Sequence, residues 1–164
     1  MIKIQPMLPA HWPQVRKIYE EGIESGHATF ETEAPAWPKW DAAHGSQCRL
    51  VITDNATIAG WAAISQVSNR KVYSGVAEVS IYISTAAQGK GLGSQLLAAL
   101  IVASEQAGYW TLQSSIFPEN KASLQIHLKN GFRVIGYRER VACMNGQWRN
   151  TMLLERRSII NGLT

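Results

Sequence analysis

The sequence predicts an α/β layered domain, in which a mixed sheet carries helices on its faces. Segments with strand-like alternation or short apolar runs alternate with segments whose apolar residues recur at helical spacing. A glycine-rich turn, QGKGLG at 88–93, joins one such strand to one such helix, and Asn145-Gly146 joins two long strand-like segments as a hairpin. No repeat, low-complexity tract or linker interrupts the 164 residues, so we expect a single domain over 1–164.

The N-terminal half is expected to begin with a strand and a helix and to continue into a hairpin. IKIQPM alternates as a strand, and Val15, Ile18 and Ile23 are among the apolar residues at helical spacing in the next segment. HATFETEAPAWP is rich in helix breakers and aromatic residues, so we expect a loop there. In order, the expected elements are a strand over 2–7, a helix over 9–25 ending at Gly26, the loop over 27–38, one or two helical turns over 39–45, and strands over 48–55 and 57–67 around a turn at Asp54-Asn55.

The C-terminal half is expected to alternate strands with helices before a final hairpin. VSIYIS is a short apolar run typical of a strand, and SQLLAALIVAS has the pattern of an amphipathic helix. Each of the two helices ends at a glycine, which is a common helix stop. The expected elements are a strand over 75–84, a helix over 94–108, a strand over 109–117, a helix over 121–130 before Gly131, and strands over 132–144 and 147–157.

The charge balance and the apolar runs exclude several kinds of partner. Lysine and arginine number 16 against 12 aspartates and glutamates, a net charge of +4, and the basic residues are scattered along the chain. A nucleic-acid-binding surface needs a basic patch or stripe, whereas this distribution fits a mildly basic pocket for an anionic small molecule. No apolar run approaches the roughly eighteen residues of a membrane span. The first residues lack the apolar region and cleavage site of an export signal, so we expect a cytoplasmic protein.

The cysteines and histidines do not indicate a metal site. Cys48 and Cys143 lie far apart and are expected to be buried, reduced thiols in strands. The four histidines, His11, His27, His44 and His127, have no ligand spacing, so we expect no metal cofactor.

The glycine-rich turn at 88–93 predicts a site for a phosphate or pyrophosphate. Glycines between a strand and a helix let backbone N–H groups converge on an anion at the helix N-terminus, and Lys90 adds a cation. The nucleotide P-loop requires serine or threonine after Gly-Lys, but Gly91 follows Lys90 here. The dinucleotide fingerprint fails as well, because the glycines are spaced Gly-x-Gly-x-Gly and no acidic residue ends a strand about twenty positions later.

What remains is Gln-x-x-Gly-x-Gly before a helix, and in this pattern the chain resembles the GNAT superfamily of N-acetyltransferases. The resemblance extends over nearly the whole chain and is greatest to the phosphinothricin and methionine sulfoximine acetyltransferase group. The order of elements is also that of the superfamily. The segments that carry the resemblance are ATFETE at 28–33, AEVSIYIS at 77–84, QGKGLGSQLL at 88–97, Asn120, SLQIHLKNGF at 123–132 and NGQWRN at 145–150.

The resemblance implies a mixed, mostly antiparallel sheet flanked by helices, with acetyl-CoA as co-substrate and no metal. The strand residues Ile81 and Ile83 would pair with the pantetheine arm, and the loop from Gln88 to Ser94 would hold the pyrophosphate. Asn120 would hydrogen-bond the cofactor near its thiol end, although its position also suits a helix N-cap, and both roles can hold. The implied cofactor-binding residues are Ile81, Tyr82, Ile83, Gln88, Gly89, Lys90, Gly91, Leu92, Gly93, Ser94, Asn120 and Ser123.

Two residues are candidates for proton transfer. Glu78 lies in the middle of an apolar strand, where an acid either faces solvent or is a base whose pKa burial raises. The resemblance implies that Glu78 is the base, acting directly or through water. His127 occupies the place where many members of the superfamily carry a tyrosine acid, and imidazole can act as acid or base. A structural histidine is the alternative. Backbone N–H groups near Tyr82 and Ile83 would face the thioester oxygen.

The acceptor implied by the resemblance is the α-amine of a small amino-acid analogue, bound by Phe30, Arg70, Tyr73 and Glu78. Two departures from the group affect this pocket. Val67 and Ser68 replace a tryptophan and a basic residue, and Asn150 replaces an aspartate. Alternatives are acetylation of a protein N-terminus or another amine, and an acyl-CoA-binding module without turnover. The resemblance also implies a homodimer.

Overall fold

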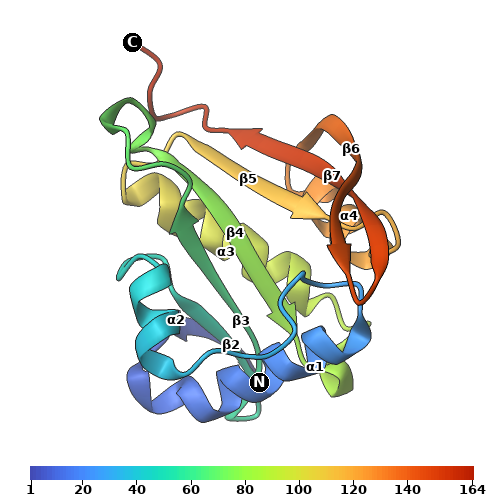
Figure 1. Ribbon diagram of the computed structural model, residues 1–164. Coiled ribbons are helices and arrows are strands. Elements are labelled where there is room, and N and C mark those ends of the chain that lie inside the picture. Colours follow the sequence, from blue (N-terminus) through green and yellow to red (C-terminus); the bar gives the residue numbers. More distant parts are fainter.

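A computed structural model describes residues 1–164 and contains one seven-stranded sheet between two layers of helices (Figure 1). The strand order is β1-β2-β3-β4-β5-β7-β6, and every neighbouring pair is antiparallel except β4 and β5. The predicted mixed, mostly antiparallel sheet with flanking helices is therefore confirmed. The strands are β1 (Ile2–Pro6), β2 (Leu50–Asp54), β3 (Thr57–Gln66), β4 (Val76–Ile83), β5 (Thr111–Ile116), β6 (Arg133–Met144) and β7 (Gln147–Arg157).

The helices cover the sheet on opposite faces because strand residues alternate in direction. In β3, Trp61 and Ala63 join a buried cluster with α1, whereas Ala62 and Ile64 join the larger cluster with α3. The helices are α1 (Trp12–Ser25), α2 (Trp37–Ala43), α3 (Leu92–Gln106) and α4 (Lys121–Lys129), with 3₁₀ turns η1 (Pro9–His11), η2 (Lys71–Tyr73) and η3 (Thr85–Ala87). None of these helices is long and apolar enough to cross a membrane.

Several boundaries differ from the sequence-based expectations. The helix expected from residue 9 begins as the 3₁₀ turn η1 and becomes α-helical at Trp12. The second helix begins at Trp37, within the expected loop, because Pro38 suits the first turn of a helix. The first hairpin turns at Asn55 and Ala56, both with positive φ (49° and 69°), one residue later than expected. The third helix begins at Leu92, inside the glycine-rich turn.

The two cysteines are free but differ in exposure. Cys48 is buried within the larger core cluster, just before β2. Cys143 is exposed, so the expectation of two buried thiols was wrong for this residue. The reason is topological, since β6 is an edge strand and most of its side chains face solvent.

Strands β4 and β5 diverge after a short parallel ladder, and this divergence opens the sheet. Only Val76–Glu78 pair with Thr111–Gln113, although β4 continues to Ile83 and β5 to Ile116. The backbone groups that face the other strand beyond Glu78 therefore have no partner in the sheet.

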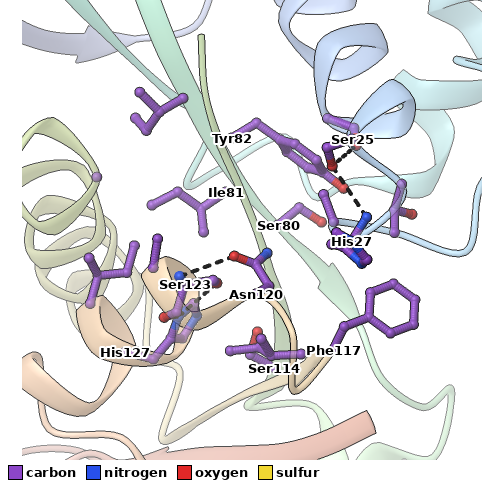
Figure 2. A pocket seen from close by; sticks show the side chains of 18 of the residues that line it. Ser25, His27, Ser80, Ile81, Tyr82, Ser114, Phe117, Asn120, Ser123 and His127 are labelled. Carbon is purple, nitrogen blue, oxygen red and sulfur yellow. Dashed lines mark hydrogen bonds between the residues drawn. The ribbon is translucent and has the colours of Figure 1, made fainter. Parts of the chain in front are cut away.

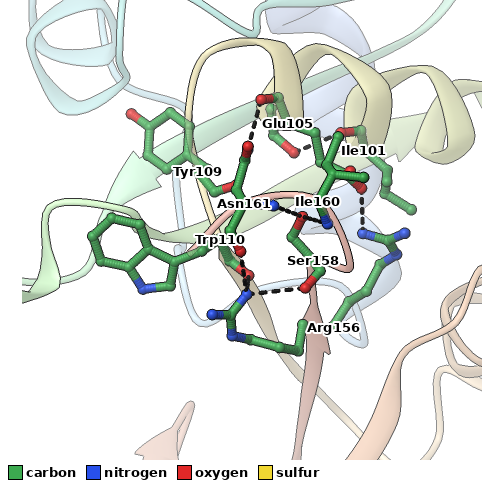
Figure 3. A network of polar contacts seen from close by, with 10 residues as sticks. Ile101, Glu105, Tyr109, Trp110, Arg156, Ser158, Ile160 and Asn161 are labelled. Atoms are coloured by element: carbon green, nitrogen blue, oxygen red, sulfur yellow. Dashed lines mark hydrogen bonds and ion pairs between the residues drawn. The ribbon is translucent and has the colours of Figure 1, made fainter. Parts of the chain in front are cut away.

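The opposite end of the β4–β5 pair is closed by the C-terminal segment (Figure 3). The Arg156 guanidinium pairs with the Glu105 carboxylate at 2.7 Å, with side-chain exposures of 20% and 12%. The Asn161 amide donates to the backbone carbonyls of Glu105 and Tyr109 at 2.7 and 2.8 Å. These contacts fix the C-terminal end of α3 against the end of β7.

Candidate functional site

A cleft of about 1070 Å³ opens where β4 and β5 diverge (Figure 2). Its walls come from segments that are far apart in the sequence: the end of α1 with the loop after it, β4, the glycine-rich turn, β5 and α4. Most of the predicted site residues line it, namely Phe30, Glu78, Ile81, Tyr82, Ile83, Gln88, Gly89, Gly91, Leu92, Gly93, Ser94, Asn120, Ser123 and His127.

The glycine-rich turn presents backbone to the cleft rather than side chains. Gly89 and Gly91 have φ values of 78° and 75°, and nothing lies within 4 Å of where their Cβ atoms would be. Glycine is therefore needed here for its backbone conformation. Gly91 caps α3 without a side-chain hydrogen bond, so the first N–H groups of this helix remain available to an anion.

Lys90 belongs to this turn but does not line the cleft. Its ammonium group pairs with the Asp54 carboxylate at 3.4 Å, and about half of the lysine side chain is exposed. A surface pair of this kind is weak, so it leaves the lysine able to change partner.

The turn is held from the other side of the cleft by α1. The Glu21 carboxylate accepts a hydrogen bond from the Thr85 backbone N–H at 2.7 Å, at the start of η3. This contact fixes the chain between β4 and the glycine-rich turn, so the turn is positioned before any ligand arrives.

Asn120 begins α4 as its N-cap. Its Oδ1 accepts from the Ser123 backbone N–H at 3.3 Å, and the residue also lines the cleft. The capping role considered from the sequence is therefore present, and one side of the amide remains open to the cleft.

His127 is fully buried in α4 and has one unpartnered nitrogen. Its Nδ1 lies 2.7 Å from the backbone carbonyl of Ser123, and a carbonyl oxygen can only accept, so Nδ1 carries the proton. The ring packs edge-on against Phe132, with centroids 4.8 Å apart. Burial lowers the pKa of His127, against the opposing effect of the Ser123 carbonyl. The imidazole is therefore neutral, and the buried Nε2 has a free lone pair.

Glu78 lies at the point where β4 and β5 part. Burial raises the pKa of its carboxyl group, while a hydrogen bond from Gln113 and the charge of Arg138 oppose this rise. A half-buried carboxyl group with a raised pKa is closer to the neutral range in which a base is effective.

Glu78 and His127 lie on opposite faces of the divided sheet. Alternation along β4 places Glu78 on the same face as Tyr82, whose ring packs against Gly22 of α1. His127 instead contacts Phe132, which belongs to the core cluster beneath α3. One ionisable group therefore approaches the gap from the α1 side and the other from the α3 side.

Aromatic side chains form the wall on the α1 side. The Tyr82 ring packs against both Tyr19 and Trp61, at centroid distances of 5.0 and 4.8 Å, and those two rings contact each other at 5.5 Å. Phe30, from the loop after α1, packs edge-on against Phe117 at the end of β5, with centroids 4.8 Å apart. This half of the cleft can therefore enclose an apolar group.

Arg70 and Tyr73 lie outside the cleft. Arg70 caps η2 and Tyr73 is its last residue; the Arg70 guanidinium stacks over the Tyr73 ring at 5.7 Å, and Tyr73 is 46% exposed. Asn150 also acts locally, because its Oδ1 accepts from the Arg140 backbone N–H at 2.7 Å, where the β6–β7 register is irregular. The single chain thus brings neither Arg70 nor Tyr73 to the cavity that contains Glu78.

Sequence reasoning missed Arg149 and His27. Arg149 reaches from β7 to the loop after α1, and His27 in that loop lines the cleft. The two residues are 122 positions apart. Arg149 belongs to the NGQWRN segment, but no local signal in that segment pairs it with His27.

Comparisons with known proteins agree with this architecture. The model of the acetyltransferase (GNAT) family matches residues 12–132. YwnH of Bacillus subtilis, which carries a provisional name as a phosphinothricin acetyltransferase, is 34% identical over 145 residues, covering 85% of this chain and 88% of its own. The L-methionine sulfoximine/L-methionine sulfone acetyltransferase of Pseudomonas aeruginosa is 30% identical over 147 residues, covering 85% and 84%.

The fold also matches a solved structure closely. The crystal structure of a GNAT superfamily phosphinothricin acetyltransferase from Sinorhizobium meliloti, in complex with acetyl-CoA, superposes with a TM-score of 0.89. It is 25% identical in sequence, and the match covers 99% of this chain and 91% of that one.

Proposed function

The chain belongs to the GNAT family of N-acetyltransferases, and on that premise we propose that it acetylates the α-amine of a small amino-acid-like acceptor with acetyl-CoA. The acceptors we propose are of the phosphinothricin, methionine sulfoximine or methionine sulfone type, which the names of its relatives suggest. The observation that carries the proposal is the gap between β4 and β5, with Glu78 on one face and His127 on the other.

The residues along the α3 side of the cleft fit acetyl-CoA. The open backbone of Gly89 and Gly91 and the N-terminus of α3 suit a pyrophosphate, and Lys90 adds a cation to the same turn. The unpaired edge of β4, from Ile81 to Ile83, offers backbone groups to an extended amide-bearing arm. When bound, acetyl-CoA supplies an activated acetyl thioester.

Glu78 is proposed to remove the proton from the acceptor amine. It faces the α1 side, where the aromatic wall containing Phe30 and Phe117 would enclose the acceptor. A carboxylate must be ionised to accept a proton, and its raised pKa makes it a stronger base than an exposed glutamate.

His127 is proposed to handle the proton on the opposite face of the gap. Its Nδ1–H is committed to the Ser123 carbonyl, so the buried, unpartnered Nε2 is the nitrogen left to exchange a proton. As the bond from the acceptor nitrogen to the acetyl carbon forms, the neutral ring would accept at Nε2 the second proton that this nitrogen loses. It would then donate that proton to the departing thiolate of CoA, on the face where α3 and the glycine-rich turn lie.

Three further predictions remain part of this proposal. Arg70 and Tyr73 are predicted to bind the acceptor, but in the single chain they lie outside the cleft. A homodimer is predicted, and light scattering of the purified protein tests it. A cytoplasmic location is predicted, and cell fractionation tests it.

The decisive experiment follows free thiol release from acetyl-CoA with a panel of amines. The panel contains methionine sulfoximine, methionine sulfone, phosphinothricin, ordinary amino acids, polyamines and short peptides. Release with the first three that is lost in Glu78→Gln supports the proposal. Thiol release only with peptides or polyamines would refute the proposed acceptor class. Binding of acetyl-CoA without thiol release in the presence of any amine would refute the proposed catalysis.

A further inference from the structure

Arg149 is a nearly buried cation that fastens the loop after α1 to the sheet. Its side chain is only 11% exposed. One terminal nitrogen donates to the Gly26 carbonyl at 2.9 Å, and the other lies 3.0 Å from His27 Nδ1 and 3.6 Å from the Glu119 carboxylate. The guanidinium carbon also lies 4.1 Å from the centre of the Phe117 ring.

The contact with Arg149 determines which nitrogen of His27 carries the proton. A guanidinium group has only N–H donors and stays protonated in proteins. Nδ1 of His27 must therefore supply the lone pair at this 3.0 Å contact. In the neutral ring the proton is then on Nε2, which becomes a hydrogen-bond donor with no partner in the protein.

His27 lies where an acceptor would end. It lines the cleft and also a smaller adjoining hollow, of about 440 Å³, whose other lining residues include Trp148 and Arg149. Glu78 sits at the inner end of the gap, where β4 and β5 part, and Phe30 follows His27 by three residues in the same loop. An acceptor with its amine at Glu78 and its side chain along the aromatic wall would direct its far end toward this rim.

We propose that His27 is an acceptor-binding residue, whose Nε2–H donates to an oxygen at the end of the acceptor that lies away from the reacting amine. Arg149 is the positioning residue that fixes the tautomer of His27 and the place of its loop. This inference rests on the proposed function and adds its specificity: the site distinguishes a side chain that ends in a sulfone, sulfoximine or phosphinate oxygen from one that does not.

The Nε2–H of His27 matters because several of the charged side chains that line the cleft are carboxylates. Glu31, Glu78 and Glu119 line the cleft and can only accept hydrogen bonds when ionised. An acceptor oxygen placed among them needs an N–H or O–H group, and His27 offers one at the rim. Glu119 is also paired with Arg149, which reduces its repulsion of such an oxygen.

The test compares methionine sulfone with methionine, which lacks the sulfone oxygens, as acceptors for the full-length protein. In His27→Phe, kcat/KM for the sulfone should fall about 3- to 10-fold, the range of one hydrogen bond to a neutral oxygen. The value for methionine and the KM for acetyl-CoA should not change. His27→Gln places an amide N–H near the position of Nε2 and should recover most of the loss.

Arg149→Met should lower the sulfone-to-methionine ratio in the same direction, because His27 loses the contact that fixes its tautomer. Arg133→Met is the matched control, since Arg133 is also a sheet arginine in an ion pair but its side chain is 72% exposed. Equal losses on both acceptors, or no loss on either, in a folded His27→Phe variant overturn the inference.

A binding measurement separates this inference from the proposed function. In protein with ¹⁵N-labelled histidine, the His27 signals, identified by their loss in His27→Phe, should show a protonated Nε2 and an unprotonated Nδ1. Adding methionine sulfone to the CoA-loaded protein should shift the Nε2 signal, whereas methionine should not. This shift without turnover retains the site and overturns the proposed acetylation, and no shift with the sulfone overturns the site.

Discussion

Replacing Gly22 by alanine places a methyl group where the ring of Tyr82 lies. The added Cβ would meet Cδ1 and Cε1 of Tyr82 at 2.7 Å, closer than van der Waals contact allows. The ring cannot simply move aside, because it packs against both Tyr19 and Trp61, with centroids 5.0 and 4.8 Å away, and those two rings also contact each other at 5.5 Å. The variant must therefore shift α1 or disturb this aromatic stack.

Two opposing effects decide the sign of the stability change. Alanine in place of glycine in a helix contributes about 1 kcal/mol of stability from propensity alone. Overpacking a rigid core typically costs about 1–3 kcal/mol. We therefore expect Gly22→Ala to lower the free energy of unfolding by about 1 kcal/mol, with a fall in Tm of roughly 2–4 °C for a domain of this size.

Urea unfolding of a double-mutant cycle tests this reasoning. In a Tyr82→Leu background the ring is absent, so Gly22→Ala should become stabilising, because only the helix propensity remains. The sign of the Gly22→Ala effect should thus reverse between the two backgrounds. If Gly22→Ala stabilises the wild-type chain by the full propensity gain, the ring has room to move and the packing argument is refuted.

Three other predictions concern charged groups. The log of kcat/KM should decline as pH falls through the raised pKa of Glu78, because protonation removes the base, and Glu78→Gln should lower kcat about 10²- to 10⁴-fold in steady-state assays. The buried neutral ring of His127 has a lowered pKa, so its contribution to stability is complete above the ordinary value of 6.5 and is lost as pH falls through the lowered one. Urea titrations across this range should show a smaller decline for His127→Gln, and an identical decline would contradict the assignment. Arg156→Met should lower the free energy of unfolding by about 1–3 kcal/mol, because it leaves the Glu105 carboxylate mostly buried without its partner. Arg133→Met should cost at most about 1 kcal/mol, since that pair is largely exposed, and equal losses would show that burial is not the cause.

Local patterns were sufficient to predict the fold and the family. Alternation identified the strands, helical spacing identified α1, α3 and α4, and the Asn145-Gly146 pair identified the last hairpin. The glycine-rich turn was informative because its residues meet a backbone requirement, seen in the positive φ of Gly89 and Gly91. Conformational requirements of this kind depend on a few neighbouring residues, so they can be inferred from a single sequence.

Contacts between distant segments could not be predicted in the same way. β7 lies between β5 and β6, an order that no local pattern records. Arg149 meets Gly26 and His27 only because β7 and the loop after α1 converge across the cleft. Arg70 was associated with the acceptor through the resemblance of its segment, but its position depends on where η2 lies relative to the gap. The roles of Glu78 and His127 remain predictions for the same reason, since activity depends on a ligand between them.

The divergence of β4 and β5 also divides the sheet mechanically. A ladder of three residue pairs joins the half containing β1 to β4 with the half containing β5 to β7. A ligand lying along the gap would bridge both halves, so its binding should raise the stability of the whole chain in proportion to the logarithm of its concentration above Kd. Amide hydrogens of residues 79–83 that face the gap should exchange rapidly in the free protein and slowly when the ligand replaces the missing strand. The two halves of the sheet should therefore unfold as one cooperative unit when the ligand is bound, which is also the state in which the enzyme can react.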